Sequence, residues 1–264
     1  MKTGTNPFAK QILHGFVLVT MRVLNSYERT YKVHMITYSL DKLPNKAVLK
    51  FFEFGRRYLN HISKDLISDH VAENIVELNA NRKRYFSKDF YIENQSRWEK
   101  VKFGDGKKSS MAYSGCEIIA AYNALIALGE QVSVDLLADL ISVFEKDGAV
   151  NNGDWGIAPL AIYDYFRNNG YETAYTDKKD PDIINQTGKE YDTVIVTVFN
   201  DKTNIMEMVH TVCITRTEDD HYVIHNGKDA SKFPLLYEAI TKVGPDSVLI
   251  CVVGINKKEC KVFD

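Results

Sequence analysis

The sequence has few cysteines, no excess of charge of one sign and no long apolar run. Four cysteines are spread along 264 residues without a CxxC pair, so we predict no metal and no cofactor. Lysine and arginine number 33 against 35 for aspartate and glutamate, which leaves a formal charge of −2 and no basic excess for nucleic acid or an anionic membrane. No apolar run approaches the roughly 20 residues that a membrane helix needs.

The amino-terminal segment also lacks the pattern of a signal peptide. Its apolar stretch, residues 12–24, is interrupted by His14 and Arg22, and no small-x-small cleavage site follows. The low cysteine content fits a reducing compartment. We therefore expect a cytoplasmic protein.

The composition allows one or two domains, because 45% of the residues are hydrophobic and can bury a large core. Residues 1–103 are predicted to form a mainly helical accessory region, with a strand at 15–23 and helices at 45–62 and about 67–78. The segment 104–108 resembles a flexible connection, which places the boundary near Phe103 and a catalytic domain at 104–264. A lid, a substrate-docking surface, a dimer contact and simple packing stay open as roles of the first region.

The second region has the element order of an α+β fold, with helices that precede and pack on an antiparallel sheet. Helices are predicted from Glu117 up to Gly129, at 134–146 after a Ser133 cap, and at 160–168 after Pro159. Strands are predicted at 193–199, 207–215, 222–225 and 247–255.

Cys116 stands at the first turn of the first of these helices, within SSMAYSGCEIIAAYNALIALG. Unpaired backbone N–H groups at a helix start carry partial positive charge, which stabilises a thiolate and lowers the pKa of a cysteine. The position therefore favours a nucleophile. A buried and inert cysteine is the alternative, and it is the ordinary state of a cysteine taken alone.

A histidine downstream offers a base for that thiol. A five-residue loop is predicted to join the two middle strands, and pairing of Thr215 with His221 across it sets His210 opposite Asn226. Opposed residues in an antiparallel pair point to the same face about 5 Å apart, so the asparagine amide can orient the imidazole. The neighbouring His225 is one residue off this register and is predicted to face away. An ordinary strand histidine and an Asn-Gly turn are the alternatives.

The order Cys116, His210, Asn226 resembles the papain-like cysteine peptidases, and within them the C39-like family related to bacteriocin-leader peptidases. The resemblance rests on SGCEIIAAYNALIALG, GDWGIAPLAIYDYFRNNGY, HTVCI and YVIHN, and it spans residues 104–255. It implies a papain-like fold, with Cys116 as nucleophile, His210 as base and Asn226 as orienting residue, and a peptide or protein as substrate.

The sequence departs from that family at the oxyanion donor. Such enzymes usually carry a glutamine a few residues before the nucleophile, but Ser110 stands six residues before Cys116 and the segment 107–116 contains no Gln, Asn or Asp. Hydroxyls of Ser109, Ser110 and Tyr113 are therefore the candidate donors beside the Cys116 N–H.

The expected function is hydrolysis of a peptide or amide bond through a Cys-His-Asn triad and a thioester. A candidate wall of the substrate groove is the loop between the second and third helices, with Asn152, Asp154 and Trp155, and a structural turn around a buried tryptophan is its alternative. An amine, alcohol or thiol acceptor would make the same site an acyltransferase or a transglutaminase-like enzyme. Because a missing oxyanion donor costs about a hundredfold or more in rate, an inactive peptide-binding homologue also stays open.

Overall fold

The computed structural model describes residues 39–59, 70–86, 91–106, 110–203, 208–227 and 229–257. The strand expected at 15–23 and the beginning of the second expected helix lie outside these ranges. The described residues belong to one compact unit. Within them, no helix is both long and apolar enough to cross a membrane.

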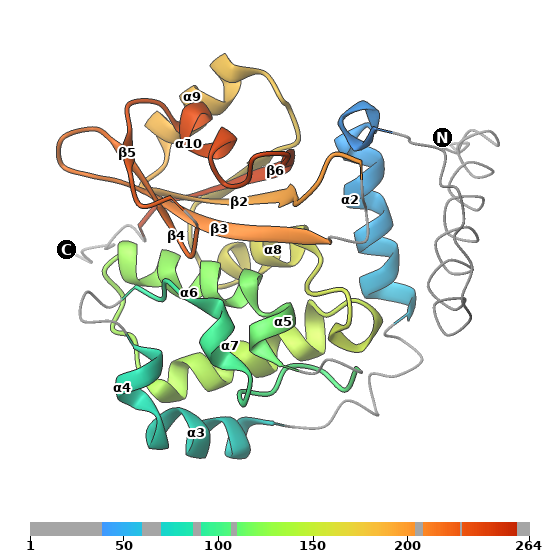
Figure 1. The fold of residues 1–264 in the computed structure, drawn as a ribbon, viewed down its shortest axis with the longest axis vertical. Helices are drawn as coiled ribbons and strands as arrows, with labels where there is room; N and C mark the ends of the chain where they lie inside the picture. Colours follow the sequence, from blue (N-terminus) through green and yellow to red (C-terminus); the bar gives the residue numbers. More distant parts are fainter. Residues whose placement is uncertain are drawn as a thin grey trace, which may run out of the picture. The chain divides into compact units, whose positions relative to one another are not determined.

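A six-stranded antiparallel sheet forms the centre of the described part of the chain (Figure 1). Its strands lie in the order β1 (Thr173–Thr176), β6 (Val248–Ile255), β2 (Thr193–Phe199), β3 (Val209–Arg216), β4 (Tyr222–His225) and β5 (Lys232–Phe233). Strands β2 and β6 are buried along their whole length, as continuous apolar and β-branched runs predict. The fold class is α+β, as expected.

Helices cover both faces of this sheet (Figure 1). One layer contains α6 (Cys116–Ala127), α7 (Val134–Asp147) and α8 (Pro159–Asn168), and the other contains α9 (Pro181–Glu190) and α10 (Leu236–Thr241). Alternate residues of a strand point to opposite faces, so Ile195 packs with the first layer and its neighbours Val194 and Val196 with the second.

The helix ends follow the local signals of the sequence. After α6, Gly129 adopts a left-handed φ of 82°, which a glycine adopts without steric cost. Ser133 caps α7, since its Oγ accepts a hydrogen bond from the Leu136 N–H at 3.0 Å. Pro159 is the first residue of α8. These predictions are confirmed.

The described part of the first region is helical. Its elements are η2 (Leu40–Lys42), α2 (Asn45–Phe54), the π-helical turn η3 (Gly55–Leu59), α3 (Val71–Ala80), α4 (Arg82–Tyr85) and η4 (Gln95–Trp98). Two short elements of the second region complete the set, α5 (Met111–Ser114) and η5 (Asn151–Gly153). The α2 helix begins at residue 45, as predicted.

The two predicted regions share one core, and the boundary expected near Phe103 passes through it. Trp98 and Phe103 are fully buried in the same cluster as Ile119 of α6 and Leu137 of α7. Large aromatic side chains bury most area when they pack against other elements, so the aromatic-rich segment before residue 104 joins this cluster.

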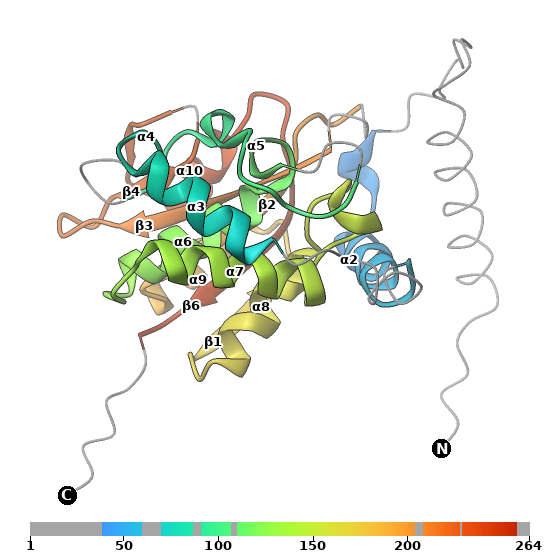
Figure 2. The same cartoon turned by 90° about the horizontal axis from the view of Figure 1, so that it is seen from below.

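A buried polar contact ties α3 to α7, which lie side by side in Figure 2. Nδ1 of His70, before α3, lies 2.7 Å from Oε1 of Glu145 on α7. The Gly104 N–H donates to the same oxygen at 2.8 Å. Residue 103 is therefore not a boundary between compact units.

Candidate active site

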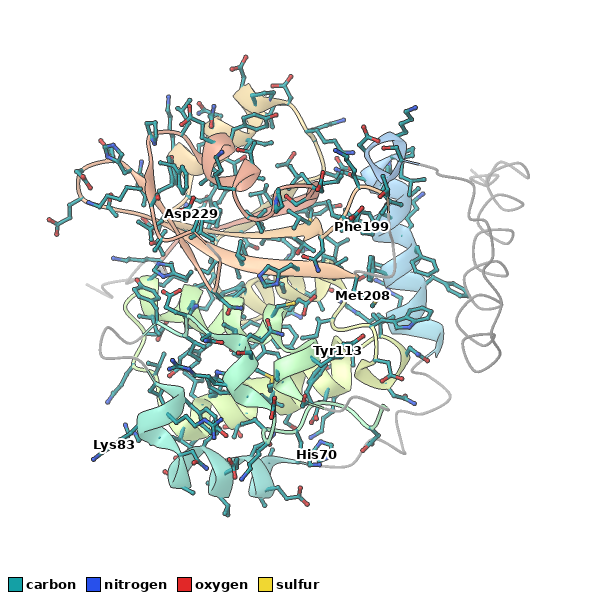
Figure 3. All side chains as sticks on the ribbon, in the orientation of Figure 1. His70, Lys83, Tyr113, Phe199, Met208 and Asp229 are labelled. Atoms are coloured by element: carbon teal, nitrogen blue, oxygen red, sulfur yellow. The ribbon has the colours of Figure 1, made fainter. Side chains whose placement is uncertain are left out.

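A cavity of about 370 Å³ opens beside the start of α6 and the start of β3. Tyr113 of α5 and Met208, which precedes β3, line it and are labelled in Figure 3. The lining residues that matter for chemistry are Gln95, Cys116, Glu117, Asp154, Trp155 and His210. The cavity thus brings together Cys116 and His210, two residues that the sequence separates widely.

Cys116 is the first residue of α6 and a free thiol, 5% exposed. In this structure its Sγ donates a hydrogen bond to Oε2 of Glu117 at 3.1 Å, rather than to His210. Burial, the charge of Glu117 and this hydrogen bond raise the pKa of the Cys116 thiol well above its usual value, while the backbone of Thr211 acts in the opposite direction. The expected lowering of this pKa is wrong, because desolvation and a neighbouring carboxylate outweigh the helix-start dipole.

Glu117 is a functional candidate that the sequence reasoning missed. Its side chain is fully buried at the cavity wall, and burial raises the pKa of its carboxyl to about 7, although the Cys116 thiol and nearby N–H groups lower it in part. The sequence feature that could have identified it is a single carboxylate in a mainly apolar helix, directly after the candidate nucleophile.

His210 contacts Asn226 through the backbone and not through the amide. Its Nε2 lies 3.1 Å from the Asn226 carbonyl oxygen. A carbonyl only accepts hydrogen bonds, so Nε2 carries the proton and Nδ1 of the neutral ring is the basic nitrogen. The backbone therefore fixes the tautomer that the asparagine amide was expected to fix.

The predicted hairpin register is wrong, because the pair next to the loop is Arg216 with Tyr222 instead of Thr215 with His221, one residue further along each strand. The observed pairs run from Arg216 with Tyr222 to Cys213 with His225, so β4 ends before Asn226, whose φ is 61°. The loop is closed by the Thr217 N–H, which donates to the His221 carbonyl at 2.7 Å. This turn-closing bond starts the loop one residue later than the polar pattern suggested.

The Asn226 side chain instead holds Gln95, a second residue that the sequence reasoning missed. Asn226 Oδ1 accepts from the Gln95 N–H at 3.1 Å, and its Nδ2 lies 3.4 Å from Gln95 Oε1. Gln95 Nε2 in turn donates to the carbonyls of Met111 and Ala112, both at 3.2 Å. Gln95 was overlooked because it stands 21 residues before Cys116, outside the segment searched for an amide donor.

His225 faces away from the cavity-lining His210, as predicted. Its Nδ1 lies 2.6 Å from Glu93 Oε1, its Nε2 lies 2.9 Å from Thr215 Oγ1, and Tyr91 stacks on the ring at a centroid distance of 3.8 Å. Burial raises the pKa of Glu93, but hydrogen bonds from His225 and the Asn226 N–H hold it below its usual value overall. This network fixes the backbone that carries the Asn226 carbonyl.

The remaining candidates divide between the cavity and its surroundings. Tyr113, Asp154 and Trp155 line the cavity, and Trp155 stacks on Phe51 at 6.0 Å. Among the described residues, Ser110 and Asn152 do not line it, and Ser109 lies outside the described ranges. The described residues contain no cluster of three His, Cys, Asp or Glu side chains arranged to hold a metal ion.

No family model, no curated protein and no solved structure matches this chain, so the case for its function rests on the chemistry of this cavity.

Proposed function

We propose that the protein is a cysteine peptidase or amidase that cleaves a peptide or amide bond of a peptide or protein substrate at the cavity around Cys116. One observation carries the proposal. A thiol at a helix start and an imidazole whose tautomer leaves Nδ1 basic line the same cavity, with a glutamine amide beside them. The resemblance to C39-like papain-like peptidases supports the same assignment of Cys116 and His210.

In the proposed reaction, the thiol turns from Glu117 to His210 and transfers its proton to Nδ1. The thiolate attacks the carbonyl carbon, and the Cys116 N–H stabilises the developing oxyanion. The Gln95 amide adds a second donor when its Nε2 exchanges the hydrogen bond to the Met111 or Ala112 carbonyl for one to the oxyanion. His210 then protonates the leaving amine, and a thioester remains on Cys116. Water, deprotonated by His210, attacks the thioester and releases the acid with the free thiol.

The raised pKa of Cys116 favours a second candidate, a protein that binds peptides without cleaving them. A thiol that stays protonated at neutral pH is a poor nucleophile. The two candidates differ in whether contact with substrate can release the thiol from Glu117.

Hydrolysis of fluorescein-labelled casein and of short fluorogenic amides tests the proposal. We expect measurable turnover by the wild-type protein, and its loss in both Cys116→Ala and His210→Ala. His221→Ala is the matched control, because His221 is a loop histidine outside the cavity lining. Turnover that survives Cys116→Ala would contradict the proposal, and absence of turnover on every substrate would favour the binding protein.

A further inference from the structure

The Glu117 carboxyl has no role in the hydrolysis proposed above, yet it lies at the cavity wall next to the nucleophile. Its side chain is fully buried, and Oε1 has no hydrogen-bond partner among the described residues. The Thr211 hydroxyl and the Ile157 backbone are near enough to favour the ionised form, but neither completes a hydrogen bond to Oε1. Oε2 accepts a hydrogen bond from the Cys116 thiol, a weak donor.

A buried carboxylate without a paired cation is one of the costliest groups in a protein, because it loses its hydration without compensation. Folding alone does not explain it, since the rest of α6 is mainly apolar. The described lining of the cavity holds a second carboxylate, Asp154, and includes no lysine or arginine. Among the described residues that line the cavity, Glu117 therefore has no cationic partner.

We propose that Glu117 binds a primary ammonium group of the substrate, so that the enzyme acts on peptides or amides with a free amine close to the scissile bond. The inference rests on the proposed function, because it takes the thiol beside Glu117 as the attacking group.

The geometry limits how far the ammonium group can lie from the reacting carbonyl. Oε2 is 3.1 Å from Sγ. A charged hydrogen bond adds about 2.8 Å and an attack distance about 3.5 Å, so the two substrate groups lie within roughly 9 Å of each other. The α-amino group of the residue that supplies the acyl group meets this limit, and so does a lysine side chain on that residue.

Gly156 leaves room for such a group beside the carboxyl. A Cβ at this position would stand 3.3 Å from both carboxylate oxygens, and the φ of 71° also requires a residue without one. Trp155, the preceding residue, supplies an aromatic surface at the same cavity, which suits a cation. A small rotation of the Glu117 side chain past Gly156 brings Oε1 into contact with the ammonium group.

Pairing with an ammonium group also frees the nucleophile. It neutralises the charge that opposes thiolate formation and competes with the thiol for the carboxylate. The thiol then turns to Nδ1 of His210. A substrate with the amine thereby activates the enzyme that cleaves it.

Charge preference in thiol modification tests the inference without any need for hydrolysis. We would measure the rate at which 2-aminoethyl methanethiosulfonate and its neutral ethyl analogue modify Cys116 at pH 8, by mass spectrometry of the Cys116 peptide. Each reagent forms a disulfide with Sγ and releases methanesulfinate. The ratio of the two rates is normalised to that of N-acetylcysteine, so a general change in thiol reactivity cancels.

We expect the wild type to favour the cationic reagent by about tenfold or more, as opposite charges a few ångströms apart require. Glu117→Gln should bring the ratio near one, whereas Asp154→Asn should keep most of the preference. A wild-type ratio equal to that of N-acetylcysteine would overturn the inference even if the Gln variant does not fold. An unchanged ratio in a folded Gln variant would overturn it as well.

Three fluorogenic amides of aminomethylcoumarin identify the source of the ammonium group. Faster cleavage of the alanyl amide than of N-acetylalanyl amide supports an α-amino group, and faster cleavage of the N-acetyl-lysyl amide supports a lysine side chain. Equal cleavage of all three overturns the inference and leaves the hydrolase standing. If Cys116 prefers the cationic reagent but no amide is cleaved, the ammonium site is supported and only the proposed hydrolysis is overturned.

Discussion

Replacement of Glu117 by glutamine is expected to make Cys116 a faster nucleophile. Oε2 lies 3.1 Å from Sγ, so a thiolate formed there faces a negative charge at contact distance. Two unit charges about 4 Å apart repel by about 4 kcal/mol at an effective dielectric constant near 20, which corresponds to about a thousandfold in thiolate population. A less basic thiolate is less nucleophilic, with a slope of about 0.5, so roughly half of the logarithmic gain is lost. We therefore expect alkylation to be about thirtyfold faster at pH 8.

The assay is alkylation of Cys116 by iodoacetamide, followed on the Cys116 peptide from pH 5.5 to pH 9. The gain should be largest above pH 7 and should shrink below it, because the wild-type carboxyl, with a pKa of about 7, becomes neutral there. Asp154→Asn removes another carboxylate of the same cavity and serves as the control. Slower alkylation of Glu117→Gln would refute the reasoning, since it would mean that Glu117 accepts the thiol proton during the reaction.

Three further predictions concern the surroundings of the thiol. His210→Ala should abolish hydrolysis, whereas His225→Ala should leave Cys116 reactive. His225→Ala should instead lower the free energy of unfolding in urea by about 2–4 kcal/mol, because the hydrogen bonds of His225 to Glu93 and Thr215 are lost. Equal loss of activity in the two variants would contradict this prediction. Gln95→Ala should reduce kcat by about a hundredfold or more with little change in iodoacetamide labelling, and an unchanged kcat would exclude Gln95 as an oxyanion donor. Finally, the pKa of Glu117 rises from 4.5 to about 7 on folding, so its stabilising contribution is complete below pH 4.5 and is lost as the pH rises through 7. As the pH rises from 4.5 to 8, the unfolding free energy of Glu117→Gln minus that of the wild type should thus increase by about 3 kcal/mol. A difference that does not change with pH would contradict the assignment.

The sequence by itself determined the local structure around the site. The place of Cys116 at the first turn of α6, the Ser133 cap and Pro159 at the head of α8 were all predicted, because caps and apolar periodicity act over a few residues. The central strands β2 and β6 followed from their continuous apolar runs. The opposite orientation of His210 and His225 also held, because a shift of one residue on both strands preserves the alternation of faces.

Only the tertiary structure decided which groups meet and how they are charged. The contact between Gln95 and Asn226 joins residues 131 positions apart, and no local pattern encodes it. The register of β3 and β4 depended on a turn-closing bond of Thr217, which moved Asn226 out of the strand. The sign of the Cys116 pKa shift depended on burial beside Glu117, and desolvation is set by everything that packs around a group rather than by its place in a helix.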